Sequence, residues 1–377
     1  MRGARLSEPS ELARSGVVVT YSPHLQGLAD SHEQATQIEL SKRLAALKGW
    51  TFGGAYNASR EYEVPVYFVS SDTLVDIARA HEIGIFNEHD LFGGVVPHAF
   101  IATKAITHPV LDQTSFAPPG WSHDFGKRVR DVVFSGFTVF TRDDAISAGA
   151  CLLKHGSVRI KPVRQAGGRG QIVISNASEL KRAIESLDPK ELSHAGLVLE
   201  ENLTEVTTYT VGHVRVADLL ATYFGKQRLT TDNNNETVYG GSDLTVLRGD
   251  FELFAELDAP REVCVAIDHA RVYDRAATAC FPGIFASRRN YDVAWGRDST
   301  GAWRCGVLEQ SWRLGGASGA EILALEAFRA DHDLELVRAS TFEVYGKCTP
   351  PPPNAAITFR GVDERIGPLT KYALVLQ

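Results

Sequence analysis

Residues 159–175 read RIKPVRQAGGRGQIVIS, which places a lysine in an apolar run, then a cluster of small residues, and then a second apolar run. Glycine reaches positive φ without steric cost, so the segment alone could be a β-hairpin with a glycine-rich turn. A lysine fixed on a strand can also bind phosphate, and backbone N–H groups of a following glycine-rich loop can close over phosphate oxygens. The segments around it decide between these two interpretations.

The bulk composition is typical of a globular protein with more than one domain. The chain has 377 residues, of which 44% are hydrophobic and 23% charged, enough for two or three domains with separate cores. Its net charge of −7 argues against nucleic acid as a partner. The five cysteines lack CxxC spacing and no apolar run approaches eighteen residues. We therefore expect a cytoplasmic protein with reduced thiols, no zinc knuckle and no membrane partner.

The first hundred residues predict a parallel α/β unit. Apolar runs at 16–22 and 64–71 flank an amphipathic pattern at 32–47, and a further helix with an Asp N-cap is expected at 72–84. No GxGxxG follows the first run, so a dinucleotide site is not expected there. The sequence FAPPGW at 116–121 cannot continue a helix or a central strand, which places a domain boundary near residue 120.

The rest of the chain alternates further helices and strands. Asn176 and Glu179 have capping-box spacing, and the buried strand expected at 196–203 contains two carboxylates, Glu200 and Glu201. Other patterns predict helices at 142–155, 261–279 and 319–330, paired strands at 207–226, a long polar loop at 230–243, and an extended proline-rich tail from 347 laid over the surface.

Two acidic residues in the C-terminal half of the chain form a candidate metal site. Asp292 and Glu309 would lie on neighbouring strands of a hairpin turned by RDSTG, and two carboxylates facing one way can hold Mg²⁺. Arg313, four residues after Glu309, can bind a carboxylate or a phosphoryl group in bidentate fashion. Glu309 lies in an apolar strand, where a lone carboxylate would be costly, so a metal or arginine partner is expected.

With these segments in order, the chain resembles the ATP-grasp superfamily over residues 127–328. The shared pattern is a strand with Lys-Pro, a glycine-rich loop, a hinge Glu, and paired acidic metal ligands followed by Arg and Gly-Gly. The whole chain further looks like a branch known only as a domain of unknown function. The resemblance implies an α/β protein, α+β in its nucleotide domains, with an ATP-grasp fold preceded by a Rossmann-like parallel α/β domain. The implied domains are 1–120 (pre-ATP-grasp), 121–200 (lid with lysine strand and loop), 201–346 (metal and substrate site) and 347–377 (tail).

The resemblance also implies roles for individual residues. Lys161 would contact the α- and β-phosphates of ATP, with an earlier phosphate contact from Lys127, for which Arg128 and Arg130 compete. Either Glu200 or Glu201 would meet adenine or ribose. Mg²⁺, or Mn²⁺, would be held by Asp292, Glu309 and Ser311, where Ser311 replaces the usual Asn and is a shorter, weaker ligand. Lys161 and Arg313 are the implied catalytic residues, and the implied phosphate-covering loop consists of Gly167, Gly168, Arg169 and Gly170.

Several of these residues also have structural interpretations. Asp292 could form a turn hydrogen bond or pair with Arg288 or Arg289, and Arg313 could be only the partner of Glu309. Three histidines, His24, His98 and His108, would lie where loops at the carboxyl ends of parallel strands line a crevice, although a packing role is favoured for them.

The function implied is that of an ATP-dependent ligase. It would activate a substrate carboxylate as an acylphosphate and join it to an amine or another nucleophile, most simply forming a carbon–nitrogen bond and releasing ADP and phosphate. Its partners would be these small molecules, with a homodimer as the assembly to consider. Residues 230–243 and the N-terminal domain would select the acceptor. The alternative, motivated by Ser311, is a regulatory nucleotide-binding protein that keeps the fold without turnover.

Overall fold

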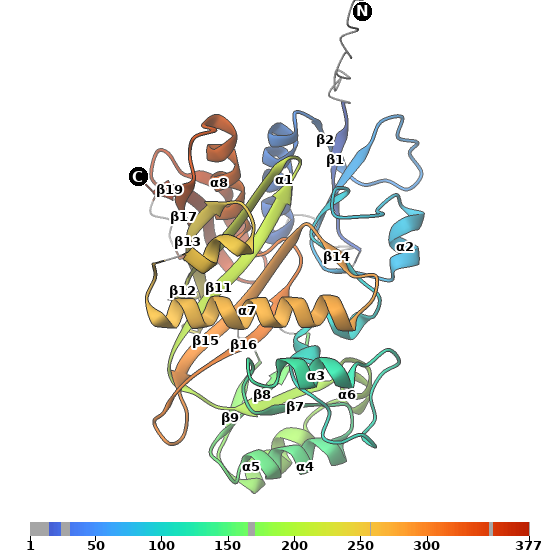
Figure 1. Ribbon diagram of the computed structural model, residues 1–377, viewed down its shortest axis with the longest axis vertical. Coiled ribbons are helices and arrows are strands. Elements are labelled where there is room, and N and C mark those ends of the chain that lie inside the picture. The colour runs from blue at the N-terminus through green and yellow to red at the C-terminus, as the bar shows by residue number, and fades with distance from the viewer. Residues whose placement is uncertain (1–14, 24–30, 165–169, 257, 347–349, 377) are drawn as a thin grey trace, which may run out of the picture.

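The computed structural model describes residues 15–23, 31–164, 170–256, 258–346 and 350–376 of the chain. It begins with a four-stranded parallel sheet in the order β2-β1-β3-β5, at the upper right of Figure 1. This confirms the predicted parallel α/β unit. The strands are β1 (Val17–Tyr21), β2 (Thr51–Ala55), β3 (Val66–Ser70) and β5 (Leu91–Phe92).

Two helices belong to this first unit. Helix α1 (His32–Lys48) starts at Ser31, whose side chain accepts from the backbone N–H of Gln34, and ends at Gly49, which has a left-handed φ of 66°. Helix α2 (Ile77–Glu82) starts later than predicted, because Leu74–Val75 form strand β4 and Asp76 is the N-cap. Strand β4 pairs in a small sheet with β6 (Gly94–Val96), which also pairs with β14 (Phe285–Ala286).

A second sheet and the helices packed on it, which together we call the lid, occupy the bottom of Figure 1. Its order is β7-β10-β8-β9, and all its pairs are antiparallel. Two short 3-10 helices and α3 precede it, and apolar residues of α4, α5 and α6 pack on its strands in a core of their own. The elements are η1 (Ala99–Ala102), η2 (Lys104–Thr107), α3 (His123–Val129), β7 (Gly136–Val139), α4 (Arg142–Leu152), β8 (Val158–Pro162), β9 (Ile172–Ile174), α5 (Ala177–Glu185), α6 (Pro189–Ala195) and β10 (Leu197–Glu201).

The largest sheet has eight strands in the order β16-β15-β11-β12-β13-β17-β19-β18. Along β11, Tyr209 and Val211 pack in the same cluster as α7, whereas Val214 and Val216 pack in the cluster of α8. Because side chains alternate along a strand, the two helices cover opposite faces. The elements are β11 (Thr204–Val216), β12 (Leu219–Thr231), β13 (Thr237–Arg248), η3 (Phe251–Glu256), α7 (Arg261–Cys280), β15 (Arg288–Arg297), β16 (Trp303–Ser311), α8 (Ser318–Ala330), β17 (Leu336–Tyr345), β18 (Ala356–Asp363) and β19 (Gly367–Leu376).

Two predicted segments differ from the structure. The polar loop expected at 230–243 is a hairpin, in which β12 continues to Thr231 and β13 starts at Thr237. The C-terminal tail is not laid over the surface between 356 and 376, because β18 and β19 extend the large sheet beyond β17. Leu369, Thr370, Ala373 and Leu374 are buried there, so both faces of β19 are partly covered.

No helix within the described part of the chain is long and apolar enough to span a bilayer.

Candidate functional site

A large cavity lies between the lid, the eight-stranded sheet and the first α/β unit. Its volume is about 740 Å³, in the range of small-molecule sites. The lid contributes Lys161, Glu200 and Glu201, and the β15–β16 hairpin contributes Asp292, Glu309 and Ser311. Arg313 also lines it, as do residues of α1, β17 and β19. The cavity therefore brings together most of the site residues predicted from sequence.

Lys161 is the buried cation of this site. Its side chain is 5% exposed and forms an ion pair with Oε1 of Glu200, which is on the neighbouring strand β10. His108 donates from Nε2 to the other carboxylate oxygen of Glu200 at 3.0 Å. A Cβ at position 136 would meet the His108 ring at 2.8 Å, so Gly136 allows this close approach. Lys161, Glu200 and His108 therefore form one buried row with the Glu200 carboxylate in the middle.

The row fixes the charge of Glu200. Burial alone would raise the pKa of this carboxyl, but the Lys161 ammonium and the hydrogen bond from His108 outweigh it and lower the pKa to about 2. Both oxygens of Glu200 thus have protein partners. Glu201 is less buried, and its Oε1 accepts from the backbone N–H of Ser135 at 3.1 Å. Contact of either residue with adenine or ribose stays a prediction.

The lysine predicted to make an earlier phosphate contact lies outside the cavity lining. Lys127 is exposed on α3 and does not line the cavity. Lys104 of η2 is 5% exposed instead, with its Nζ 3.1 Å from Oε2 of Glu309. The partner expected for Glu309 was a metal or an arginine, and in this structure it is Lys104. The signal in the sequence was a single lysine inside the mostly apolar stretch HAFIATKAITHP at 98–109.

Asp292 and Glu309 lie directly opposite each other in the β15–β16 pairing, as the hairpin pattern predicted. Nδ2 of Asn290 donates to Oδ1 of Asp292 at 3.0 Å. Burial, followed by repulsion from Glu309, raises the pKa of Asp292 to about 6. Two like charges held this close gain from a divalent cation between them.

The donor set fits magnesium bound together with a phosphate ligand. Among the described residues, no group of three or more His, Cys, Asp or Glu side chains gathers for a metal. Mg²⁺ commonly uses one or two carboxylates and takes its other oxygens from phosphates and water. Asp292 and Glu309, with the Ser311 hydroxyl on the same cavity wall, match that pattern.

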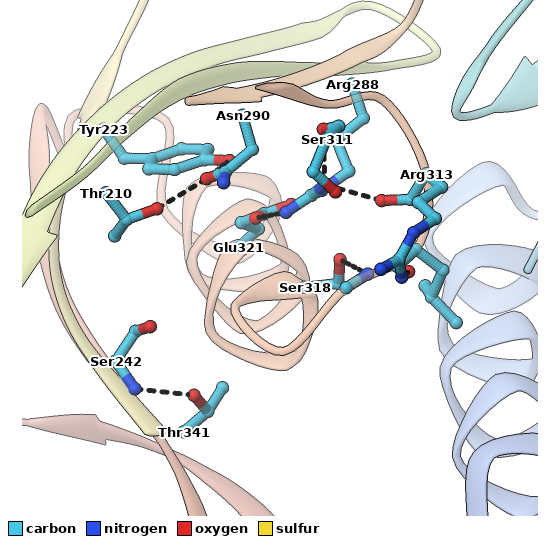
Figure 2. A network of polar contacts seen from close by, with 12 residues as sticks. Thr210, Tyr223, Ser242, Arg288, Asn290, Ser311, Arg313, Ser318, Glu321 and Thr341 are labelled. Atoms are coloured by element: carbon cyan, nitrogen blue, oxygen red, sulfur yellow. Dashed lines mark hydrogen bonds and ion pairs between the residues drawn. The ribbon is translucent and has the colours of Figure 1, made fainter. Parts of the chain in front are cut away.

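A buried ion pair positions the segment that carries Ser311 and Arg313, as Figure 2 shows. Arg288 and Glu321 are fully buried, and their two parallel hydrogen bonds measure 2.8 and 2.7 Å. NH1 of Arg288 also donates to the carbonyls of Ser311 at 3.1 Å and Arg313 at 2.5 Å. These bonds hold the segment against the cavity, with the Arg313 guanidinium bound to the Leu314 carbonyl at 2.9 Å.

The two arginines considered as partners of Asp292 form their ion pairs with other carboxylates. Arg288 pairs with Glu321, and Arg289 pairs with Asp274 at 2.8 Å. Asn290, which also lines the cavity, was not predicted from the sequence. Its Oδ1 accepts from Thr210 at 2.5 Å and from Tyr223 at 3.1 Å, and it lies opposite Ser311 in the β15–β16 pairing.

Some of the remaining predicted residues lie outside the described part of the chain, and the others lie within it. Gly167, Gly168 and Arg169 lie outside the described residues, as does His24. Gly170 is described and has a left-handed φ of 68°. His98 stacks on Phe100 at 5.7 Å, which is the packing role favoured for it.

A family model described as "Protein of unknown function (DUF3182)" matches residues 20–373. The chain belongs to this family. No curated protein matches the chain.

Three solved structures that are similar to this chain are those of enzymes whose sequences have low identity to it. The N5-carboxyaminoimidazole synthetase of Staphylococcus aureus complexed with ADP is 9% identical with a TM-score of 0.53, over 96% of this chain and 93% of that one. The carboxyaminoimidazole ribonucleotide synthase of Aspergillus clavatus complexed with ATP is 11% identical (TM-score 0.51; 97% and 94% covered). The phosphoribosylamine–glycine ligase of Thermotoga maritima is 13% identical (TM-score 0.51; 95% and 91% covered). These similarities show that the fold is that of the ATP-grasp ligases, as the sequence resemblance implied.

The raised pKa of Asp292 predicts a pH-dependent gain in stability for Asp292→Asn. Between pH 4 and 6 the folded chain binds more protons at Asp292 than the unfolded chain does. The unfolding free energy of the metal-free protein therefore falls as the pH rises through this range, and the loss is complete above pH 6. The variant should gain about 1–2 kcal/mol of unfolding free energy at pH 8 and little at pH 4. Urea unfolding with a chelator present measures this. Asp131→Asn, at a carboxyl that is 87% exposed, is the control, and an equal change of the Asp292 variant at both pH values contradicts the interpretation.

Proposed function

We propose that the protein is an ATP-dependent ligase that activates a substrate carboxylate as an acylphosphate and joins it to an amine, releasing ADP and phosphate. The supporting observation is that one cavity is lined by a buried lysine, Lys161, and by two opposed carboxylates, Asp292 and Glu309. A magnesium–nucleotide complex carries both charges that such a site complements. Two of the structural relatives were solved with ATP or ADP, which also supports a nucleotide ligand.

The side chains of this cavity have separate tasks in the proposed reaction. Lys161 would present a fixed positive charge to the phosphates, and Asp292 and Glu309 would hold the metal ion that accompanies them. Mg²⁺ or Mn²⁺, when bound, supplies neutralisation of the phosphate charge. Arg313 holds the substrate carboxylate in line with the γ-phosphorus, so that a carboxylate oxygen forms the new bond and ADP leaves. The amine then displaces phosphate, forming the carbon–nitrogen bond and losing one proton.

A regulatory nucleotide-binding protein is the second candidate. The observation that favours it is Ser311, whose hydroxyl is a weaker metal ligand than the amide usual at this position. Both candidates bind nucleotide, so product formation separates them.

The identity of the nucleotide product tests the ligase proposal. Because the carboxylates and Lys161 would stabilise charge on the terminal phosphates, carboxylate and amine mixtures should produce ADP and phosphate, without AMP. Ion-exchange chromatography of reactions with MgATP resolves these products, and Arg313→Gln should abolish the substrate-dependent ADP while still binding nucleotide. Substrate-dependent AMP would overturn the acylphosphate mechanism. If no mixture from a broad library yields any product, the regulatory candidate is favoured.

Replacing Glu200 should couple nucleotide binding to proton uptake. Without its counter-charge, the buried Lys161 ammonium is destabilised, so that binding of the nucleotide phosphates should draw a proton onto the site. Calorimetry at pH 8 in buffers of different ionisation enthalpy should give close to zero protons for wild type and up to one for Glu200→Gln, with roughly tenfold weaker binding.

Glu201→Gln is the matched control, because the neighbouring Glu201 does not pair with Lys161 and should bind without proton uptake. Equal proton counts for wild type and Glu200→Gln would show that Glu200 does not maintain the charge of Lys161.

A further inference from the structure

One end of the cavity is built by α1 together with the C-terminal strands β17 and β19. We call it the α1 recess and define it by His32, Thr36, Glu343 and Lys371, all of which line the cavity. The backbone N–H of His32 donates to Oδ2 of Asp363 on β18 at 3.0 Å. The start of α1 is therefore fixed to strands that the sequence had placed in a surface tail.

The recess contains one positive and one negative side chain. Nζ of Lys371 lies 2.9 Å from Oε1 of Glu343, and their side chains are only 14% and 13% exposed. Burial, followed by the charge of Lys371, lowers the pKa of His32, which keeps its ring neutral at neutral pH. Glu33 is exposed beside it at the cavity lining. The recess thus carries no excess of positive charge.

Two polar atoms of the recess have no hydrogen-bond partner within the described structure. They are Nδ1 of His32 and Oγ1 of Thr36, both inaccessible to water. The two residues are four positions apart on α1 and so lie on one face of the helix. Because water does not reach these two atoms from the cavity, a ligand would meet them only after a side-chain rotation, and the ion pair of Glu343 and Lys371 is the part of the recess that lines the cavity with charge.

The recess is adjacent to the metal-binding carboxylates. Tyr239 lines the same cavity, and its hydroxyl bonds with Oγ of Ser242 at 2.8 Å. The Tyr239 hydroxyl also lies 3.3 Å from Oγ1 of Thr341 on β17, the strand that carries Glu343, and Asp292 and Glu309 line the same cavity. A ligand in the recess would therefore lie close to the reacting phosphate of the proposed nucleotide.

We propose that the α1 recess binds one of the two substrates and that this substrate is a small zwitterion of the α-amino-acid type. The inference rests on the proposed ligase function. The ammonium group would lie against Glu343 and the carboxylate against Lys371, the two charged side chains of the recess.

Other classes of ligand match the recess less well. A phosphoester dianion would face Glu343 and Glu33 with a single lysine to balance it. A simple amine would leave Lys371 facing a like charge, and an apolar ligand would desolvate the ion pair without replacing its water contacts.

The test is calorimetry on the full chain saturated with Mg²⁺ and the imido analogue of ATP. The probes are the twenty standard amino acids, with methylamine, acetate, bicarbonate and phosphoethanolamine as comparison ligands. At least one amino acid should bind, and at least tenfold more tightly than any comparison ligand.

Variants assign the binding to the recess. Lys371→Met and Glu343→Gln should each weaken the amino acid at least tenfold while leaving nucleotide affinity unchanged. The matched control is Glu326→Gln, which breaks the half-buried pair with Arg43, outside the cavity lining, and should change neither affinity. If a single variant does not fold, the charge-exchanged pair Glu343→Lys with Lys371→Glu keeps an ion pair and should still lose amino-acid binding.

The outcomes separate this inference from the proposed function. Nucleotide binding without binding of any amino acid overturns the recess proposal alone, as does amino-acid binding that none of the recess variants alters. Failure of the wild-type chain to bind nucleotide overturns the ligase proposal.

Discussion

The architecture of the site depends on one buried carboxylate, Glu200, held between Lys161 and His108. An ionised carboxylate so completely removed from water is tolerated only when every partner is present. Lys161 comes from the lid, whereas His108 follows η2 outside it, so the charge balance of Glu200 fixes the lid against that segment. The lysine proposed to meet phosphate is thereby held in place before any ligand arrives.

The same short segment reaches the opposite wall of the cavity. Lys104 at its start pairs with Glu309, and Nε2 of Gln310 donates to the carbonyl of Thr103 at 2.8 Å. On the lid side, the hydroxyl of Thr138 donates to the carbonyl of Ala105 at 2.7 Å. Residues 103–108 therefore link the side of the cavity that carries Lys161 and Glu200 to the side that carries Asp292 and Glu309. The Arg288–Glu321 pair fixes the adjoining segment around Arg313 in a similar way, through a buried charge that also binds backbone carbonyls.

Local sequence pattern was sufficient to predict the strands that hold the candidate site residues. Apolar periodicity and turn residues predicted the strand of Lys161 and the hairpin that brings Asp292 opposite Glu309, because both depend on neighbours in sequence. The pairing of Lys104 with Glu309 could not be predicted in this way, since the two residues lie 205 positions apart in the chain. The C-terminal strands were missed because a proline-rich start favoured an extended segment, whereas pairing with β17 decides their place. The α1 recess combines three such distant segments and had no local signal at all.

A crystal structure with magnesium and the imido analogue of ATP tests the central claim most directly, which is that the cavity between lid and sheet is a magnesium–nucleotide site. The account predicts that the phosphates contact Lys161 and that the metal is bound by Asp292 and Glu309, with Lys104 released from its contact with Glu309. A nucleotide bound elsewhere, or bound in this cavity without contact to Lys161 and the two carboxylates, would contradict it.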